Sequence, residues 1–208
     1  SNKFGLTVKE IKNKGFHISK QINTSLISDK SENITSTMGK ILSKLSINLK
    51  NLNPDLIVIL GDRYEALVAA IASVIENIPI AHFHGGETIL GAIDEKFRNA
   101  LTCLSDYHFT STETHKENVI RIKGSPKNVF NIGAMGLDNI KNITLMKHDI
   151  FSMQFKFNIS VPFILMTFHP ETVRLKNRDH IKCIIECLKE ITLPVLCTLP
   201  NADIEGDI

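Results

Sequence analysis

The sequence predicts an α/β fold: a parallel, doubly wound, Rossmann-like sheet covered by helices. Short apolar strands and helical patterns alternate along most of the 208 residues. The strands are rich in Ile and Val, as is usual in sheets that are buried on both faces. Several βα units follow one another in series, which favours parallel strands joined by right-handed crossovers.

The predicted elements follow in a regular order. A helix around Leu6–Asn13 precedes a longer one over Ser36–Asn51, in which apolar residues recur at spacings of three and four. Strands and helices then alternate: strands Leu56–Leu60, Ile78–Phe83, Tyr107–Ser111 and Val129–Ile132, and between them helices Tyr64–Glu76, Asp94–Leu104 and Glu113–Lys123. Thr112 is expected to cap the last of these helices, because its hydroxyl can accept from the first free backbone N–H groups.

The hydrophobic pattern of the sequence changes after Gly136. Residues 138–160 are polar and weakly periodic, as expected of a crossing between domains. A strand, a helix and a strand follow: Phe163–Phe168, Asn177–Glu190 and Val195–Leu199. They are too few to enclose a core of their own. We therefore expect residues 1–148 to form a first Rossmann-like domain without its opening strand. Residues 149–208 would form a linker and the incomplete beginning of a second such domain.

The composition excludes several classes of protein. Apolar residues make up 43% of the chain, which is normal for a globular protein. The net charge is only +2 and the lysines are scattered, so neither nucleic acid nor a membrane surface is an expected partner. No apolar run approaches the roughly 18 residues of a membrane helix, so we expect a cytoplasmic protein. The cysteines show neither disulfide nor zinc spacing and are expected to be buried, reduced thiols: Cys103, Cys183, Cys187 and Cys197.

Ionisable residues and glycines follow the first two predicted strands directly. Asp62 and Arg63 come after the first strand, and the second runs into His84-Gly85-Gly86-Glu87. In a parallel α/β sheet these positions share the edge where ligands bind. Asp62 could act as a base or accept a sugar hydroxyl, or it could cap the next helix. Arg63 is either a partner for phosphate or carboxylate or simply exposed.

The paired glycines of this turn allow a ligand to approach the backbone closely. His82, His84 and Glu87 make a zinc site conceivable, but no HExxH-type spacing occurs. We therefore predict no metal.

A further group of charged residues opens the helix at Asp94. Asp94 and Arg98 are four residues apart and share one helix face, with Glu95 beside them. They form either a surface ion pair or, together with Glu87, a crowded carboxylate cluster suited to acid–base chemistry. His169, with Glu171 close by, ends the first strand of the second unit, where it is either a proton shuttle or an ordinary surface histidine.

Five blocks, in this order and spacing, resemble the UDP-N-acetylglucosamine 2-epimerase family: GDRYE, HFHGGETILGAIDEKFRNA, YHFTSTET, VFNIGAMGLDNI and TFHPET. The resemblance covers nearly the whole chain. It implies a GT-B-type architecture, in which two Rossmann-like domains face each other across a cleft that binds a UDP-sugar. The chain would supply most of the first domain and the start of the second. His84-Gly85-Gly86-Glu87 and His169-Pro170-Glu171-Thr172 resemble the hydrolysing branch, which releases UDP and a free 2-epimeric sugar for sialic-type acids.

The resemblance also implies roles for individual residues. Asp62, Glu87, Asp94 and His169 are the expected catalytic residues. Those expected to bind substrate are Arg63, His84, Gly85, Gly86, Glu95 and Arg98. Where many members have a Glu before the glycine pair, this sequence has His84. Either Glu87 replaces the displaced carboxylate or His84 transfers the proton itself.

The implied reaction needs no cofactor. Loss of the C2 proton as UDP leaves C1 gives a glycal, and water then adds to give the opposite configuration at C2. The substrate is expected to be UDP-N-acetylglucosamine or UDP-N,N′-diacetylbacillosamine, and the full-length protein a homo-oligomer, either a dimer or a tetramer. We expect residues 1–208 alone to show little turnover. Two alternatives stay open: a GT-B-type glycosyltransferase, and a non-catalytic sugar-nucleotide-binding module.

Overall fold

The computed structural model describes residues 8–24, 30–169 and 177–199. Their contacts divide the chain into two compact units, Ser1–Leu137 and Asp138–Ile208, and each unit is considered by itself. The assignment of these units to two domains of a longer enzyme stays a prediction.

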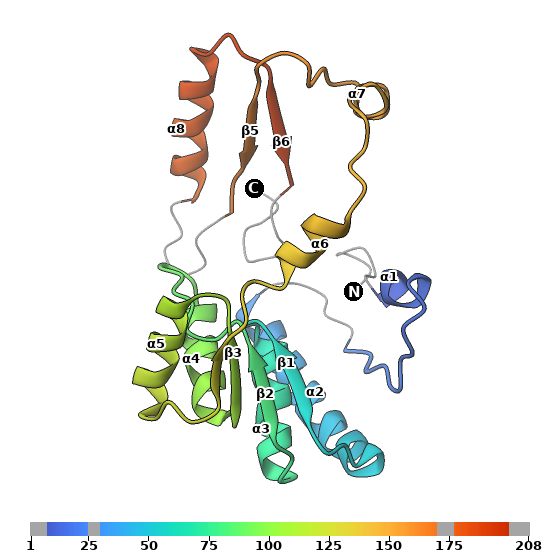
Figure 1. Ribbon diagram of the computed structural model, residues 1–208, viewed down its shortest axis with the longest axis vertical. Helices are drawn as coiled ribbons and strands as arrows, with labels where there is room; N and C mark the ends of the chain where they lie inside the picture. Colours follow the sequence, from blue (N-terminus) through green and yellow to red (C-terminus); the bar gives the residue numbers. More distant parts are fainter. Residues whose placement is uncertain (1–7, 25–29, 170–176, 200–208) are drawn as a thin grey trace. The chain divides into compact units, whose positions relative to one another are not determined.

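A four-stranded parallel sheet is the centre of the first unit (Figure 1). Its strands are β1 (Ile57–Leu60), β2 (Ile80–Phe83), β3 (Tyr107–Thr110) and β4 (Val129–Asn131), and they lie in the order β1-β2-β3-β4. The helices are α1 (Val8–Asn13), α2 (Ser31–Leu52), α3 (Tyr64–Ile75), α4 (Asp94–Leu104) and α5 (Glu113–Lys123). The predicted parallel α/β fold is confirmed.

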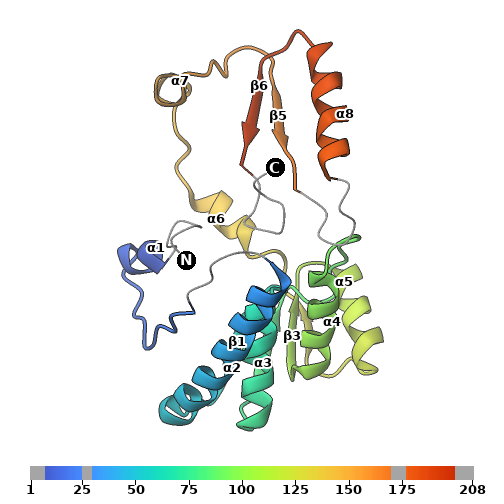
Figure 2. The ribbon, with the colours of Figure 1, turned by 180° about the vertical axis from the view of Figure 1, so that it is seen from behind.

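Helices α2 to α5 lie on one face of this sheet, as Figure 2 shows from behind. Each strand pairs with the one before it, so right-handed crossovers must place the connecting helices on the same side. Helix α3 packs against both α2 and α4, and α4 packs against α5. The core between helices and sheet is built around Ile59, Ile80, Ala70 and Leu101, all at most 5% exposed.

The opposite face of the sheet is apolar but open. Val58 and Leu60 of β1 are 64% and 60% exposed. Phe109 stacks between two aromatic neighbours there, with ring centroids 4.6 Å from Phe83 and 5.6 Å from Phe130. The hydrophobic stabilisation of this unit therefore comes mainly from the helix-covered face. Loss of a buried side chain there should cost more stability than loss of an exposed one on the open face.

The second unit carries a smaller parallel sheet. Helix α6 (Gly136–Asn142) leads into it, and α7 (His148–Phe155) precedes β5 (Ile164–Thr167), α8 (Asn177–Lys189) and β6 (Val195–Thr198). Strands β5 and β6 are parallel, with Ile164 opposite Val195. The strand, helix and strand predicted for this part of the chain are confirmed.

Residues 138–160, predicted as a crossing between domains, contain most of α6 and all of α7. One expectation was wrong. The four cysteines are free, but all of them are exposed rather than buried.

None of the described helices is both long and apolar enough to span a bilayer.

Two histidines lie side by side beneath the helices. His82 of β2 is in register with His108 of β3, and both are fully buried. Nε2 of His82 donates to the carbonyl of Gly61 at 2.8 Å. Burial and the nearby charge of Lys123 lower the pKa of His108 from 6.5 to about 4. Burial likewise lowers the pKa of His82, so both side chains are neutral at pH 7.

These histidines make stability depend on pH. The unfolded chain binds a proton at His108 as pH falls below 6.5, whereas the folded chain does so only near 4. Stability is therefore lost between these values, by about 2 kcal/mol from pH 7 to pH 5. We expect His108→Leu to remove this part of the pH dependence in denaturant titrations at the two pH values. The same change at exposed His17 should leave the dependence intact. An unchanged difference between pH 7 and pH 5 in His108→Leu would refute the assignment.

Candidate active site

The carboxyl ends of β1 and β2 bring the first group of candidate residues together. Leu60 and Phe83 are paired in the sheet, so the residues that follow them leave the same edge side by side. Gly61 has φ +85°, a left-handed conformation that glycine adopts without strain, and Asp62 follows it. His84 also has positive φ, at 63°. A side chain other than glycine in this conformation is strained, which is frequent at functional sites.

Arg98 ties three segments of this edge together. It is only 4% exposed and forms an ion pair with Asp62, which is 18% exposed and lies thirty-six residues earlier. Its other terminal nitrogen donates to the backbone carbonyl of Glu87 at 2.7 Å. That nitrogen also lies 3.8 Å from the carboxylate of Glu95. The sequence suggested Asp94 as a partner for Arg98; the ion pair with Asp62 is one that helical spacing did not suggest.

Asp62 does not cap helix α3. The N-cap position is occupied by Arg63, and no side-chain hydrogen bond caps this helix. Of the two roles considered for Asp62, a carboxylate held at the ligand edge is the one that the geometry favours. Arg63 itself is exposed, with its guanidinium 3.4 Å from Glu65 and over the ring of Tyr64.

A chain of hydrogen bonds begins at His84. Its Nδ1 lies 2.7 Å from Oε1 of Glu87, and Oγ of Ser111 lies 2.8 Å from the same oxygen. Ser111 in turn lies 2.8 Å from Nδ1 of His115. Burial alone would raise the pKa of Glu87, but the hydrogen bonds from His84 and Ser111 and the charge of Arg98 lower it below its ordinary value. Glu87 is therefore ionised at neutral pH.

Sequence reasoning missed Ser111 and His115. Ser111 follows β3, the strand next to β2, so its position after a strand end was the signal that could have found it. His115 lies one helical turn later, in the first turn of α5, where Thr112 caps the helix as predicted. His82 does not join this group. It is buried on the helix-covered face of the sheet, where its neighbour in register is His108.

The two glycines after His84 are packed tightly. A Cβ on Gly85 would lie 3.1 Å from Nδ1 of His82. Gly86 has φ +78°, and a Cβ there would lie 2.2 Å from the carbonyl oxygen of His115. Asn118 of α5 donates to the carbonyl of Gly86 at 2.9 Å. The glycine pair thus lets the turn lie directly on α5, which brings Glu87 within reach of Ser111.

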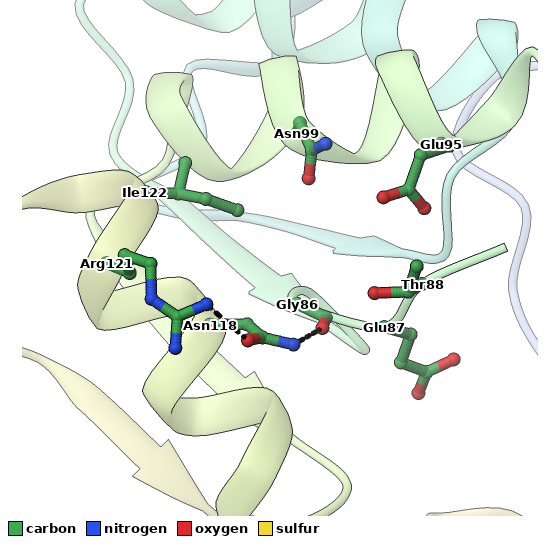
Figure 3. Close-up of a pocket in the computed structure, with 8 residues that line it drawn as sticks. All are labelled: Gly86, Glu87, Thr88, Glu95, Asn99, Asn118, Arg121 and Ile122. Atoms are coloured by element: carbon green, nitrogen blue, oxygen red, sulfur yellow. Dashed lines mark hydrogen bonds between the residues drawn. The ribbon is translucent and has the colours of Figure 1, made fainter. Parts of the chain in front are cut away.

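A cavity of about 170 Å³ adjoins this turn (Figure 3). It lies between the turn, α4 and α5, and its lining residues are Gly86, Glu87, Thr88, Glu95, Asn99, Asn118, Arg121 and Ile122. Pockets that enclose a drug-sized ligand hold about 300 to 1,000 Å³. This cavity alone is therefore too small for a sugar nucleotide.

The remaining candidates occupy other positions. Asp94 is the first residue of α4 and is half-buried. Glu95 accepts a hydrogen bond from the backbone N–H of Ile89 at 2.9 Å, which fixes the loop between β2 and α4. His169 follows β5 in the second unit and is exposed. Glu171 lies outside the described residues.

The fold and these contacts define an α/β domain with an acid–base cluster at the ligand edge of its sheet. The chain belongs to the UDP-N-acetylglucosamine 2-epimerase family, whose sequence model matches residues 1–208. The predicted family is confirmed.

Three relatives match over essentially the whole chain. It is 35% identical over 208 residues to a GDP/UDP-N,N′-diacetylbacillosamine 2-epimerase (hydrolyzing) from Campylobacter jejuni. It is 32% identical over 206 residues to a UDP-N,N′-diacetylbacillosamine 2-epimerase (hydrolyzing) from Legionella pneumophila. Polysialic acid biosynthesis protein P7 from Escherichia coli is 31% identical over 210 residues. These matches cover at least 99% of this chain and 54% of each relative, so the chain spans about half their length.

Solved structures share the fold. The UDP-GlcNAc 2-epimerase from Neisseria meningitidis, crystallised with UDP-GlcNAc, aligns with a TM-score of 0.73 at 18% identity. The match covers 91% of this chain and 54% of the other. A UDP-GlcNAc 2-epimerase from Methanocaldococcus jannaschii aligns at 0.71 and 21% identity, over 92% of this chain and 53% of the other.

The close packing of Gly86 gives a stability prediction. Gly86→Ala should destabilise the protein in two ways, by the left-handed backbone and by the clash with His115. Gly124 also has positive φ, at 75°, but nothing lies within 4 Å of its Cβ position. Gly124→Ala should therefore cost only the backbone term of about 1–2 kcal/mol. Gly86→Ala should cost about 1–3 kcal/mol more, measured by denaturant unfolding. Equal losses would show that the turn is not packed against α5.

The ion pair of Arg98 gives a second prediction. Asp62→Asn leaves a guanidinium that is 4% exposed without its counter-charge, so its effect must depend on whether Arg98 is present. A double-mutant cycle with Arg98→Met should show a coupling of about 1–3 kcal/mol in the free energy of unfolding.

The matched control is the pair Lys189 and Glu186, whose side chains are 64% and 70% exposed. Lys189→Met and Glu186→Gln should be nearly additive, because water screens the interaction of exposed charges. Additive effects of Asp62→Asn and Arg98→Met would contradict the buried ion pair.

Proposed function

We propose that this chain is part of a hydrolysing UDP-sugar 2-epimerase, which releases UDP and a free sugar inverted at C2. The observation that carries the proposal is the cluster at the sheet edge, where Arg98 holds Asp62 and the backbone of Glu87. Family membership supports it, as do matches over essentially the whole of this chain to relatives that are named hydrolysing 2-epimerases.

The chemistry requires groups of the kinds found at this edge. A base must remove the C2 proton, the departing diphosphate needs stabilisation, and a proton must reach C2 from the opposite face after the glycal forms. We assign these proton transfers to Asp62, Asp94, His169 and the His84–Glu87 pair. Gly85 and Gly86 would let the backbone approach the sugar, with Arg63, Glu95 and Arg98 positioning the substrate or the groups around it. Independence from a cofactor, a homo-oligomeric state and a cytoplasmic location stay predictions.

We further propose that the sugar carries acetamido groups at both C2 and C4. The two relatives with 35% and 32% identity are named for N,N′-diacetylbacillosamine. A relative named UDP-N-acetylglucosamine 2-epimerase, from Neisseria meningitidis, is 26% identical over 144 residues. The diacetamido sugar nucleotide is therefore the preferred candidate, and UDP-N-acetylglucosamine is the second.

The test is product analysis with the complete protein in D₂O. With UDP-N,N′-diacetylbacillosamine, proton NMR should show UDP, a free sugar inverted at C2, and one solvent deuteron at C2, because the original C2 proton is lost. UDP-N-acetylglucosamine should react more slowly. Asp94→Asn should lower the rate on the order of a hundredfold, as expected for loss of a proton-transfer group.

Asp149→Asn, at an exposed position in α7, is the matched control and should have no effect. Transfer of the sugar to an acceptor without inversion at C2 would instead identify a glycosyltransferase. An inverted sugar still attached to UDP would identify a non-hydrolysing epimerase.

A further inference from the structure

Two hydrogen bonds converge on a single oxygen of Glu87. His84 approaches Oε1 from within the turn, at 2.7 Å, and Ser111 approaches it from the end of β3, at 2.8 Å. His84 and Glu87 are both partly buried, with side chains 24% and 28% exposed. The position of Glu87 is thus set from two sides.

The number of hydrogens on each group fixes the direction of the hydrogen bonds in this network. An ionised carboxylate only accepts, so both His84 and Ser111 must donate to Glu87. A serine hydroxyl has one hydrogen, and here it is used on Glu87, so Oγ of Ser111 must accept from its second neighbour. That neighbour is Nδ1 of His115, at 2.8 Å, which therefore carries a hydrogen. All the donors point toward Glu87.

We propose that Glu87, Ser111 and His115 are positioning residues that hold His84 in the tautomer protonated on Nδ1, and that Nε2 of His84 is the atom that takes the C2 proton of the sugar. In a neutral imidazole with hydrogen on Nδ1, Nε2 carries the lone pair and is the basic atom. This arrangement places the base on His84 and assigns Glu87 the task of orienting it.

The proposed step rests on the proposed function. The C2–H bond breaks, its proton moves to Nε2 of His84, and its electron pair becomes the C1–C2 double bond of the glycal. The C1–O bond breaks and its electron pair leaves with UDP. The imidazolium that forms lies 2.7 Å from the Glu87 carboxylate, which stabilises its charge.

Other charged groups surround this network. Arg98 and Glu95 face it from α4, Asp62 from the turn after β1, and His115 from α5. Arg98 lowers the pKa of Glu87 together with His84 and Ser111. Loss of the Ser111 hydroxyl removes one of these contributions, so the pKa of Glu87 rises and the acid limb of the rate profile moves to higher pH.

The experiment compares Ser111→Ala with Ser111→Thr in the complete protein. Ser111→Ala should lower kcat on the order of tenfold, shift the acid limb of the pH–rate profile upward and change KM little. Ser111→Thr retains the hydroxyl and should restore both the rate and the profile. Ser125→Ala removes a hydroxyl that contacts only the backbone of Lys127 among the described contacts and should leave both unchanged. His115→Asn, which keeps a donor near the Nδ1 position, should be milder than His115→Leu.

A second readout does not depend on turnover. With histidines labelled with ¹⁵N, the NMR signals of His84, assigned by their loss in His84→Gln, should show a protonated Nδ1 and an unprotonated Nε2 at neutral pH. Ser111→Ala should weaken this preference and Ser111→Thr should retain it. A hydrogen on Nε2 of His84, or an unaltered rate and pH profile in Ser111→Ala, would overturn the proposal. If the tautomer is found but UDP-sugars are not converted, the proposed function fails and this step fails with it, while the assigned network stands.

Discussion

The site depends on the interactions of one buried group, the guanidinium of Arg98. A charge that is only 4% exposed is stable only when it is paired and hydrogen-bonded. Arg98 meets this requirement through Asp62, from the turn after β1, and the carbonyl of Glu87, from the turn after β2. The same contacts that pair the two terminal nitrogens of the arginine therefore fix two candidate groups relative to each other. Binding and catalysis at this edge would use an arrangement that folding itself requires.

The sheet supports this edge from one side. Helices α3 to α5 bury Ile59, Ile80 and Leu101 and leave Val58 and Leu60 of the opposite face exposed. Within the same covered layer, His82 holds the carbonyl of Gly61 and lines the space beside Gly85. Packing on the helix-covered face thus fixes the backbone of the two turns that carry Asp62 and His84. A substitution in this layer is expected to disturb the site as well as the stability.

Local signals in the sequence were enough for most of the fold. The bounds of α4 and α5 were predicted to the residue, because Asp94 and Glu113 mark their first turns and Thr112 caps the second. The periodicity of α2 was found, but it begins at Ser31 rather than Ser36. Helices α6 and α7 are short, and in polar sequence they give too few apolar repeats to be detected. The exposed cysteines show that residue type alone is a poor guide to burial.

The site was predictable in its location but not in its pairing. Strand ends indicated Asp62, His84 and Glu87. Helical spacing suggested Asp94 as a partner for Arg98. It could not indicate Asp62, because the contact between Arg98 and Asp62 is made through the tertiary fold. Ser111 and His115 were missed for the same reason.

A crystal structure of the complete His84→Gln protein with its intact UDP-sugar would test the central claim most directly. C2 of the sugar should lie within about 4 Å of the side chain at position 84, close to the reach required for proton transfer. A sugar bound away from the carboxyl ends of β1 and β2 would contradict it.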